Sequence, residues 1–176
     1  MKNLFFFLII AVVFSACTKD KIEALPPITQ EGANTFGCVI NGKIYLPKGF
    51  EQNKPNFQTN INPIDSSFRF EVFRKEGVIN TRLNFGSDSI CNTGLFLVGS
   101  RTDFAYSIYS NQLSGHICET PYSYSAPSNK TGFMKITRYD LVNKIFSGEF
   151  EFQFVNPDCG IDDTVFIKQG RFDLKF

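Results

Sequence analysis

The sequence has no tryptophan, a single histidine and almost no excess of charge of either sign. One histidine cannot supply the paired histidines of a common zinc motif, and no C-x-x-C spacing occurs among the five cysteines. We therefore expect no metal and no cofactor. The 18 Lys and Arg residues against 17 Asp and Glu residues lack the basic excess that is typical of a nucleic-acid-binding domain.

Long hydrophobic runs are also missing. The longest, from Leu4 to Phe14, would make a helix of roughly 16 Å, about half of the hydrocarbon thickness of a bilayer. This excludes a membrane protein with several spanning helices. The hydrophobic fraction of 43% excludes a disordered chain and is typical of a globular domain.

The N-terminus has the pattern of a signal peptide, residues 1–16: Lys2 precedes the apolar run, and Ser15-Ala16-Cys17 follows it. Phe14-Ser15-Ala16-Cys17 resembles the bacterial lipobox, although Phe14 stands where that motif usually has leucine. The resemblance implies cleavage after Ala16 and a lipoprotein with two or three acyl chains, such as palmitate, on Cys17. Two or more chains suffice for lasting membrane attachment. The alternative is an ordinary signal peptide with a cysteine there by chance.

Residues 17–34 carry charged side chains, the adjacent Pro26 and Pro27, and no apolar periodicity. This composition predicts a flexible tether. It would span roughly 20–25 Å as a coil and up to about 55 Å when extended. By resemblance to enterobacterial sorting, Thr18 in place of aspartate favours the outer membrane, on its periplasmic face or at the cell surface. A single domain, residues 35–176, would follow.

Four cysteines remain once Cys17 is assigned to lipid, an even number that suits disulfides in an oxidising compartment. Four cysteines allow three pairings. We favour Cys91 with Cys118, because this bond would brace the least regular stretch of the chain. We also favour Cys38 with Cys159, because it would tie the first strand region to the last hairpin. Buried free thiols are the alternative.

After Thr35 the apolar residues recur with a period of two, and no stretch of about a dozen residues has helical periodicity. Asn41-Gly42 predicts a tight hairpin turn, and Lys75-Glu76-Gly77 separates the strands of a second hairpin. Near the C-terminus, phenylalanines at 150, 152 and 154 alternate with polar residues. The sequence thus predicts an all-β fold, an antiparallel β-sandwich with a β-barrel-like closure as the alternative, and no substantial helix outside the signal peptide.

Several segments occur together in the chain: the lipobox at Cys17, Phe36-Gly37-Cys38-Val39-Ile40-Asn41-Gly42-Lys43, Phe146-Ser147-Gly148-Glu149-Phe150, and Gln169-Gly170-Arg171-Phe172-Asp173. In these segments the chain resembles a family of small Bacteroidetes lipoproteins of unknown function. The resemblance implies an extracytoplasmic all-β domain. The resemblance implies no particular activity.

Catalytic patterns are weak. His116 is the sole candidate base for a hydrolase triad, and no G-x-S-x-G elbow presents a serine to it. Glu149 and Glu151 share a strand face, as a glycosidase pair could, but a solvated face opposite the phenylalanines is the simpler interpretation. The Asn156–Asp163 segment holds three acids that suit Ca²⁺, and an ordinary turn explains them equally well. We therefore predict that the protein is not an enzyme.

Four of the six tyrosines lie in residues 100–128, a stretch with few charges and many Ser, Asn and Pro residues: Tyr106, Tyr109, Tyr122 and Tyr124. This composition is typical of recognition surfaces, and packing onto the sheet edge is the alternative. The sequence favours a lipid-anchored cell-envelope protein that acts as a non-enzymatic binding or accessory module for a glycan, a peptide or a partner envelope protein. The alternatives are an extracytoplasmic glycosidase-like hydrolase and a structural envelope component.

Overall fold

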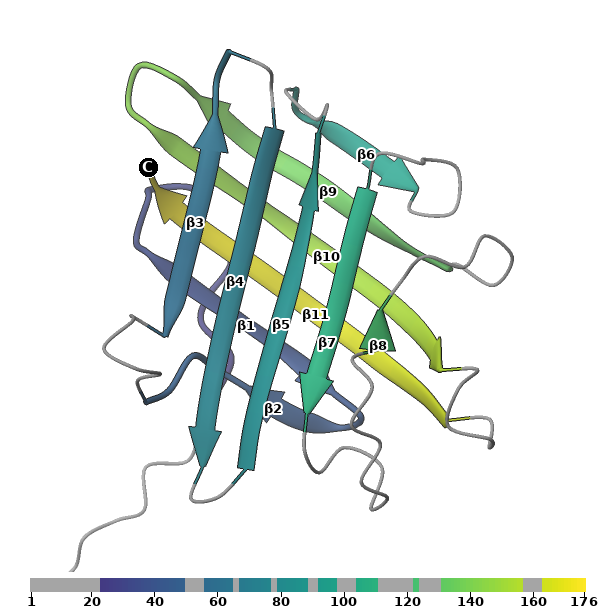
Figure 1. Ribbon diagram of the computed structural model, residues 1–176. Coiled ribbons are helices and arrows are strands. Elements are labelled where there is room, and N and C mark those ends of the chain that lie inside the picture. Colours follow the sequence, from purple (N-terminus) through teal and green to yellow (C-terminus); the bar gives the residue numbers. More distant parts are fainter. Residues whose placement is uncertain are drawn as a thin grey trace, which may run out of the picture.

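The computed structural model describes residues 23–49, 56–64, 67–76, 79–88, 92–97, 104–110, 122–123, 131–156 and 163–176 (Figure 1). All regular structure within these ranges is β-strand, and they contain no helix that could cross a membrane. The strands are β1 (Thr35–Ile40), β2 (Lys43–Tyr45), β3 (Phe57–Asn62), β4 (Ser67–Glu76), β5 (Ile79–Ser87), β6 (Gly94–Leu97), β7 (Phe104–Ser110), β8 (Tyr122–Ser123), β9 (Thr131–Asp140), β10 (Ile145–Asn156) and β11 (Asp163–Lys175).

The strands form two antiparallel sheets that pack face to face (Figure 1). The six-stranded sheet has the order β2-β1-β11-β10-β9-β6, and the five-stranded sheet has the order β3-β4-β5-β7-β8. In Figure 1 the five-stranded sheet lies in front, and its strands cross those of the other sheet obliquely. The predicted all-β sandwich is confirmed.

Among the described residues, eight of the eighteen buried side chains that form the core between the sheets are phenylalanines. Phe70 of the five-stranded sheet contacts Phe172 of the six-stranded sheet at 5.0 Å between ring centroids, and Phe85 contacts Phe150 at 4.9 Å. Each of the four side chains is at most 2% exposed. Burial of one such ring contributes about 1.5–3 kcal/mol, and tilted ring pairs add to that. Inward-facing phenylalanines therefore hold the two sheets together.

The predicted hairpin turn at Asn41-Gly42 joins β1 to β2. Both residues have positive φ angles, 48° for Asn41 and 81° for Gly42, as a tight turn of this kind requires. Asn41 also extends the pairing to β11, because its backbone N–H donates to Phe166 O at 3.0 Å and its side-chain Oδ1 accepts from Phe166 N at 2.8 Å. The second predicted hairpin is the pair β4–β5, which is in register from Phe68↔Ser87 to Glu76↔Ile79.

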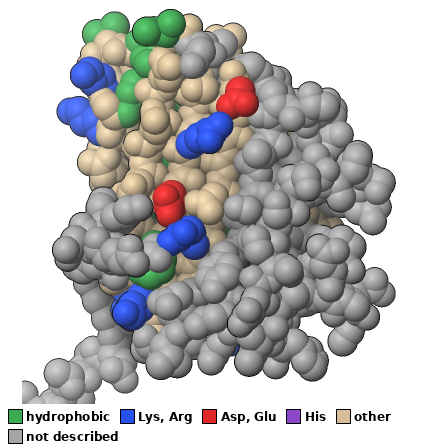
Figure 2. All heavy atoms as spheres, viewed as in Figure 1, with side chains coloured by type: hydrophobic (Ala, Val, Ile, Leu, Met, Phe, Trp, Pro, Cys, Tyr) green, Lys and Arg blue, Asp and Glu red, His purple; other side chains and the backbone are tan. Residues whose placement is uncertain are grey.

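The outer face of the five-stranded sheet is polar and carries both signs of charge (Figure 2). Arg82 Nε lies 3.1 Å from Glu71 Oε1, and Arg69 Nη2 lies 3.5 Å from Asp88 Oδ1. Such exposed pairs contribute little to stability, about 0–1 kcal/mol each. They do keep this face polar.

Candidate functional site

Residues 23–34 form an N-terminal strap that lies against the outer face of the six-stranded sheet. Gly37 of β1 makes this contact possible, because a Cβ at that position would lie 2.6 Å from Pro26 Cδ and 3.2 Å from Leu25 Cδ2. Arg171 Nη1 donates to Pro26 O at 3.2 Å, and Arg138 Nη1 donates to Gln30 O at 2.6 Å. The described part of the expected flexible tether is therefore attached to the domain. Among the described residues, 23–34 thus pack on the domain that was expected to begin at residue 35.

Asp173 of β11 is the main attachment point of the strap. The side chain points to the outer face, yet the strap covers it, and Asp173 is only 1% exposed. Five donors surround its carboxylate: Thr29 Oγ1 at 2.7 Å, Glu31 N at 3.0 Å, Gly32 N at 2.8 Å, Ala33 N at 3.2 Å and Ser147 Oγ at 2.7 Å. Four of these donors belong to the strap, so one carboxylate fixes a whole turn of it.

Burial by itself would raise the pKa of Asp173, because it removes the carboxylate from water. The hydrogen bonds from Thr29 and Ser147, followed by those from the amides of Glu31 and Gly32, outweigh this effect and lower the pKa to about 2. Hydrogen bonds to an ionised carboxylate are stronger than neutral ones. Asp173 is therefore a buried, ionised group at neutral pH.

A second attachment lies at the start of the strap, in a charge cluster of Glu23, Lys48, Arg74 and Glu76. Arg74 Nη2 binds Glu23 Oε2 at 2.8 Å and Glu76 Oε1 at 3.1 Å, and only 10% of its side chain is exposed. Lys48 Nζ lies 3.6 Å from Glu23 Oε1 and 3.5 Å from Glu76 Oε1. The hydrogen bonds from Arg74 lower the pKa of Glu76. This cluster ties the strap to the five-stranded sheet as well.

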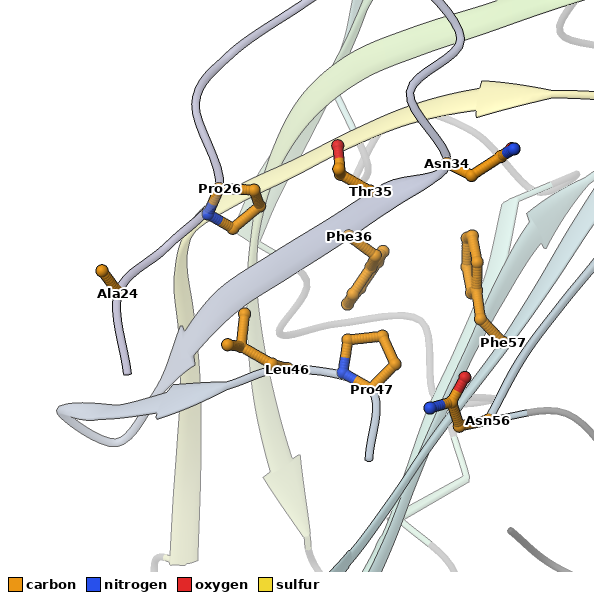
Figure 3. A pocket seen from close by; sticks show the side chains of 9 residues that line it. All are labelled: Ala24, Pro26, Asn34, Thr35, Phe36, Leu46, Pro47, Asn56 and Phe57. Atoms are coloured by element: carbon orange, nitrogen blue, oxygen red, sulfur yellow. The ribbon is translucent and has the colours of Figure 1, made fainter. Parts of the chain in front are cut away.

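The strap forms one wall of a groove of about 360 Å³ at the side of the sandwich (Figure 3). In Figure 3 the rings of Phe36, Pro47 and Phe57 and the amide of Asn56 surround the hollow. The lining carries no charged side chain and consists of Ala24, Pro26, Asn34, Thr35, Phe36, Leu46, Pro47, Asn56 and Phe57. A small apolar groove with a few polar groups is the usual form of a ligand site.

Two strand edges border this groove. β1 pairs with β2 only through Cys38, Val39 and Ile40, so no described strand lies beside Thr35–Gly37 on that side. β3 is the last strand of its sheet, and β4 is its only neighbour among the described strands. An exposed strand edge presents backbone donors and acceptors that a further strand can use. The groove therefore lies where an extended chain could pair with backbone and place a side chain among the rings.

Comparisons with protein-family models, curated proteins and solved structures find no match to this chain. The site therefore has to be interpreted from its own geometry.

Some of the predicted site residues lie outside the described residues: Cys17, Cys91, Cys118, His116, Tyr124 and Cys159. Tyr106 and Tyr109 are in β7, and Tyr122 is in β8, which pairs with β7 at the edge of the five-stranded sheet. For these three the structure describes the backbone. The register sets Tyr106 opposite Phe85, a core residue, and Tyr109 opposite the partly exposed Arg82. Positions 106 and 109 thus belong to opposite faces of the sheet.

Cys38 is a free thiol that is fully buried in the core, so the structure does not contain the predicted bond to Cys159. The register explains the difference. Gly37 lies opposite Arg171 and Val39 lies opposite Lys168, so Cys38 lies beside the middle of β11. From there to Asp163, at the start of β11, is about 20 Å along the strand. The Cα atoms of a disulfide lie within about 7 Å, so the four residues from Cys159 to Asp163, which span at most about 14 Å, could approach Cys38 only if they ran fully extended back along the sheet. Burial raises the pKa of the Cys38 thiol well above its ordinary value.

The two glutamates considered for a glycosidase pair have structural partners. Glu149 lies opposite Arg171, and its Oε1 lies 3.4 Å from Lys135 Nζ. Glu151 Oε1 accepts a hydrogen bond from Gln169 N at 3.1 Å, where Gln169 has a φ of 52°. Both carboxylates therefore stabilise the outer face of the six-stranded sheet. Within the described ranges no three metal-binding side chains come together.

Proposed function

We propose that this protein is a lipid-anchored component of the cell envelope and that its β-sandwich is a non-enzymatic binding module. The groove between the strap and β3 would hold an extended, uncharged peptide segment of a partner envelope protein. The observation that carries this proposal is the uncharged, ring-lined groove between two strand edges.

The anchor is the part of the proposal that rests on sequence. Phe14-Ser15-Ala16-Cys17 resembles a lipobox, and the acyl chains on Cys17 would hold the protein at the outer membrane. Mass spectrometry of the N-terminal peptide from the membrane fraction tests this directly. We expect Cys17 as the first residue with acyl chains attached, and a Cys17→Ala variant that is lost from the membrane fraction. An unmodified Cys17 would overturn the anchor.

A peptide fits the groove for two reasons. Its volume lies at the lower end of the range for ligand sites, so it accommodates one or two side chains rather than a whole polymer. The backbone along Phe57–Ile61 offers hydrogen bonds to an added strand, which is the usual way in which sheet edges bind extended peptides. The absence of charge in the lining favours an apolar side chain at the position that enters the groove.

The test uses the soluble form, residues 18–176, on an array of ten-residue peptides from envelope proteins and, in parallel, on an oligosaccharide array. Asn56→Arg places a charge in the groove and should weaken peptide binding by roughly tenfold or more, equivalent to about 1.4 kcal/mol. The matched control is Asn92→Arg, an exposed residue just before β6, at the opposite edge of the six-stranded sheet. This variant should bind like the parent chain.

N-methylation of alternate peptide bonds in a bound peptide should abolish binding if it pairs with a strand edge. Sugars that bind in place of peptides, and lose binding in Asn56→Arg, would assign the groove to a glycan instead. Binding that neither Asn56→Arg nor N-methylation affects would show that the groove is not the site.

A further inference from the structure

We infer that the end of the sandwich that carries Glu23 and the β4–β5 turn faces the membrane, so that the binding groove opens beside the lipid surface. This inference rests on the proposed lipid anchor at Cys17. It follows from the small number of residues between Cys17 and Glu23, and the surface next to this end would be a lipid bilayer.

Few residues separate the proposed anchor at Cys17 from Glu23. Glu23 is already held by Arg74, at 2.8 Å, so only the six residue steps from Cys17 to Glu23 separate lipid from protein. Six extended residues span at most about 22 Å. A free tether up to Thr35 would have reached roughly 60 Å, which exceeds the length of the domain and would leave its orientation open.

Glu23 lies near one end of the sandwich. Its partner Arg74 is close to the C-terminal end of β4, and the β4–β5 turn follows (Figure 1). The opposite end of β4 leads back to the β3–β4 turn, where Ile64 is 95% exposed. The eight residue steps from Ser67 to Lys75 along β4 separate the two ends by about 26 Å. The spacer is therefore shorter than the molecule, and it keeps the Glu23 end near the lipid.

The groove lies at the same end. Asn56 O accepts a hydrogen bond from Phe73 N at 2.8 Å, and Phe57 lies opposite Val72. Leu46 O, on the other wall, accepts from Arg74 Nη1 at 3.3 Å. A partner that enters the groove thus approaches within one or two residues of the membrane-facing end, which suits a partner that is itself attached to the membrane.

Neither the net charge of the chain nor the outer face of the five-stranded sheet gives a strong attraction to anionic lipid. Without residues 1–16 the chain has 17 basic and 17 acidic residues. Both signs are interspersed on the outer face of the five-stranded sheet (Figure 2). Attraction to anionic lipid needs clusters of basic residues. The orientation therefore follows from the point of attachment.

Single tryptophans can measure this orientation, because the natural chain has none. Lys75→Trp places a donor at the proposed membrane-facing end, and Ile64→Trp places one at the far end; both side chains are exposed. The purified lipoprotein is reconstituted in phosphatidylcholine vesicles that contain a dansyl-headgroup lipid as energy acceptor. We expect a large loss of tryptophan emission for Lys75→Trp and little loss for Ile64→Trp. Equal losses, or a larger loss for Ile64→Trp, would overturn the inference.

The matched control is a Gly/Ser linker of about twelve residues inserted between Ile22 and Glu23, which lengthens the coil but leaves the strap in place. The difference between the two tryptophans should then shrink. An unchanged difference would show that the short spacer does not set the orientation.

Attachment of both variants through a hexahistidine tag in place of Cys17, on nickel-chelating lipids, repeats the measurement without native lipid. A natural chain with no acyl group on Cys17 would overturn the proposed anchor alone, whereas equal quenching on nickel lipids would overturn the orientation alone. Unfolding midpoints close to that of the parent chain establish that the tryptophan variants are folded.

Discussion

At the scale of single residues, Asp173 connects the strap to the six-stranded sheet. Its carboxylate is 1% exposed and accepts hydrogen bonds from five donors, four of them in the strap. A buried charge costs several kcal/mol unless its hydrogen bonds are complete. Here they are complete, and the result is a fixed path for a segment that has no strand or helix of its own.

Asp173→Asn should lower the free energy of unfolding by roughly 3 kcal/mol, because the amide replaces one acceptor oxygen by a donor that faces other donors. Urea unfolding followed by circular dichroism measures the change. Asp88→Asn is the matched control, since its side chain is 70% exposed and its ion pair with Arg69 is weak. It should change the value by at most about 0.5 kcal/mol. A loss below about 1 kcal/mol for Asp173→Asn would contradict the role given to this residue.

At the scale of elements, the strap completes both the fold and the groove. It covers Gly37 and Asp173 on one sheet, reaches Arg74 on the other, and supplies Ala24, Pro26 and Asn34 to the groove wall. It therefore belongs to the domain.

Two truncated chains distinguish the contribution of the strap, residues 23–34, to stability from that of residues 18–22. A chain of residues 23–176 should unfold at the same urea concentration as residues 18–176, because only the spacer is lost. A chain of residues 35–176 loses the four charge-assisted hydrogen bonds from the strap to Asp173 and the packing of the strap on Gly37, and we expect its free energy of unfolding to fall by about 3 kcal/mol or more. Equal stability of the 35–176 and 18–176 chains would show that the strap is not part of the fold.

Gly37→Ala tests the same contact in the full-length chain. A methyl group would meet Pro26 Cδ at 2.6 Å and Leu46 Cδ2 at 2.9 Å, so the strap must shift. We expect a smaller loss of stability than for the truncation, of about 1–3 kcal/mol. The Gly37→Ala variant still tests the contact between the strap and β1 if the 35–176 chain does not fold.

At the scale of the whole molecule, Asp173 links stability to pH. Its pKa is about 2 in the folded state and about 3.9 in an unfolded chain, so the unfolded state binds the proton more tightly. This contribution to stability is complete above about pH 4 and is lost as the pH falls to 2. The difference corresponds to about 2–3 kcal/mol.

Urea midpoints between pH 6 and pH 2 measure this loss of stability. In the Asp173→Asn variant the loss should be smaller by about 2–3 kcal/mol. The lowered pKa values of Glu76 and Asp140 act in the same direction and remain in the variant. The same acid slope in the variant and the parent chain would contradict the assignment to Asp173.

Local patterns predicted much of this fold, since period-two alternation reports strand faces residue by residue. Phe150 and Phe152 are buried as expected, and Asn41-Gly42 forms the expected turn. Such local patterns did not predict that residues 23–34 pack on the sheet. A segment with adjacent prolines, Pro26 and Pro27, and charged residues before them is typical of a free tether. Nothing in the sequence of this segment indicates which surface of the domain it will contact.

The sequence by itself determined the all-β sandwich, its hairpins and its phenylalanine core, because these depend on alternation and turn chemistry within about ten residues. Only the tertiary structure decided that Cys38 is free, that residues 23–34 are bound and that a groove forms beside them. Thr29 and Asp173 are 144 residues apart in the chain. A bond over that distance exists only after the sheets have assembled, because β11 then presents the carboxylate to the strap.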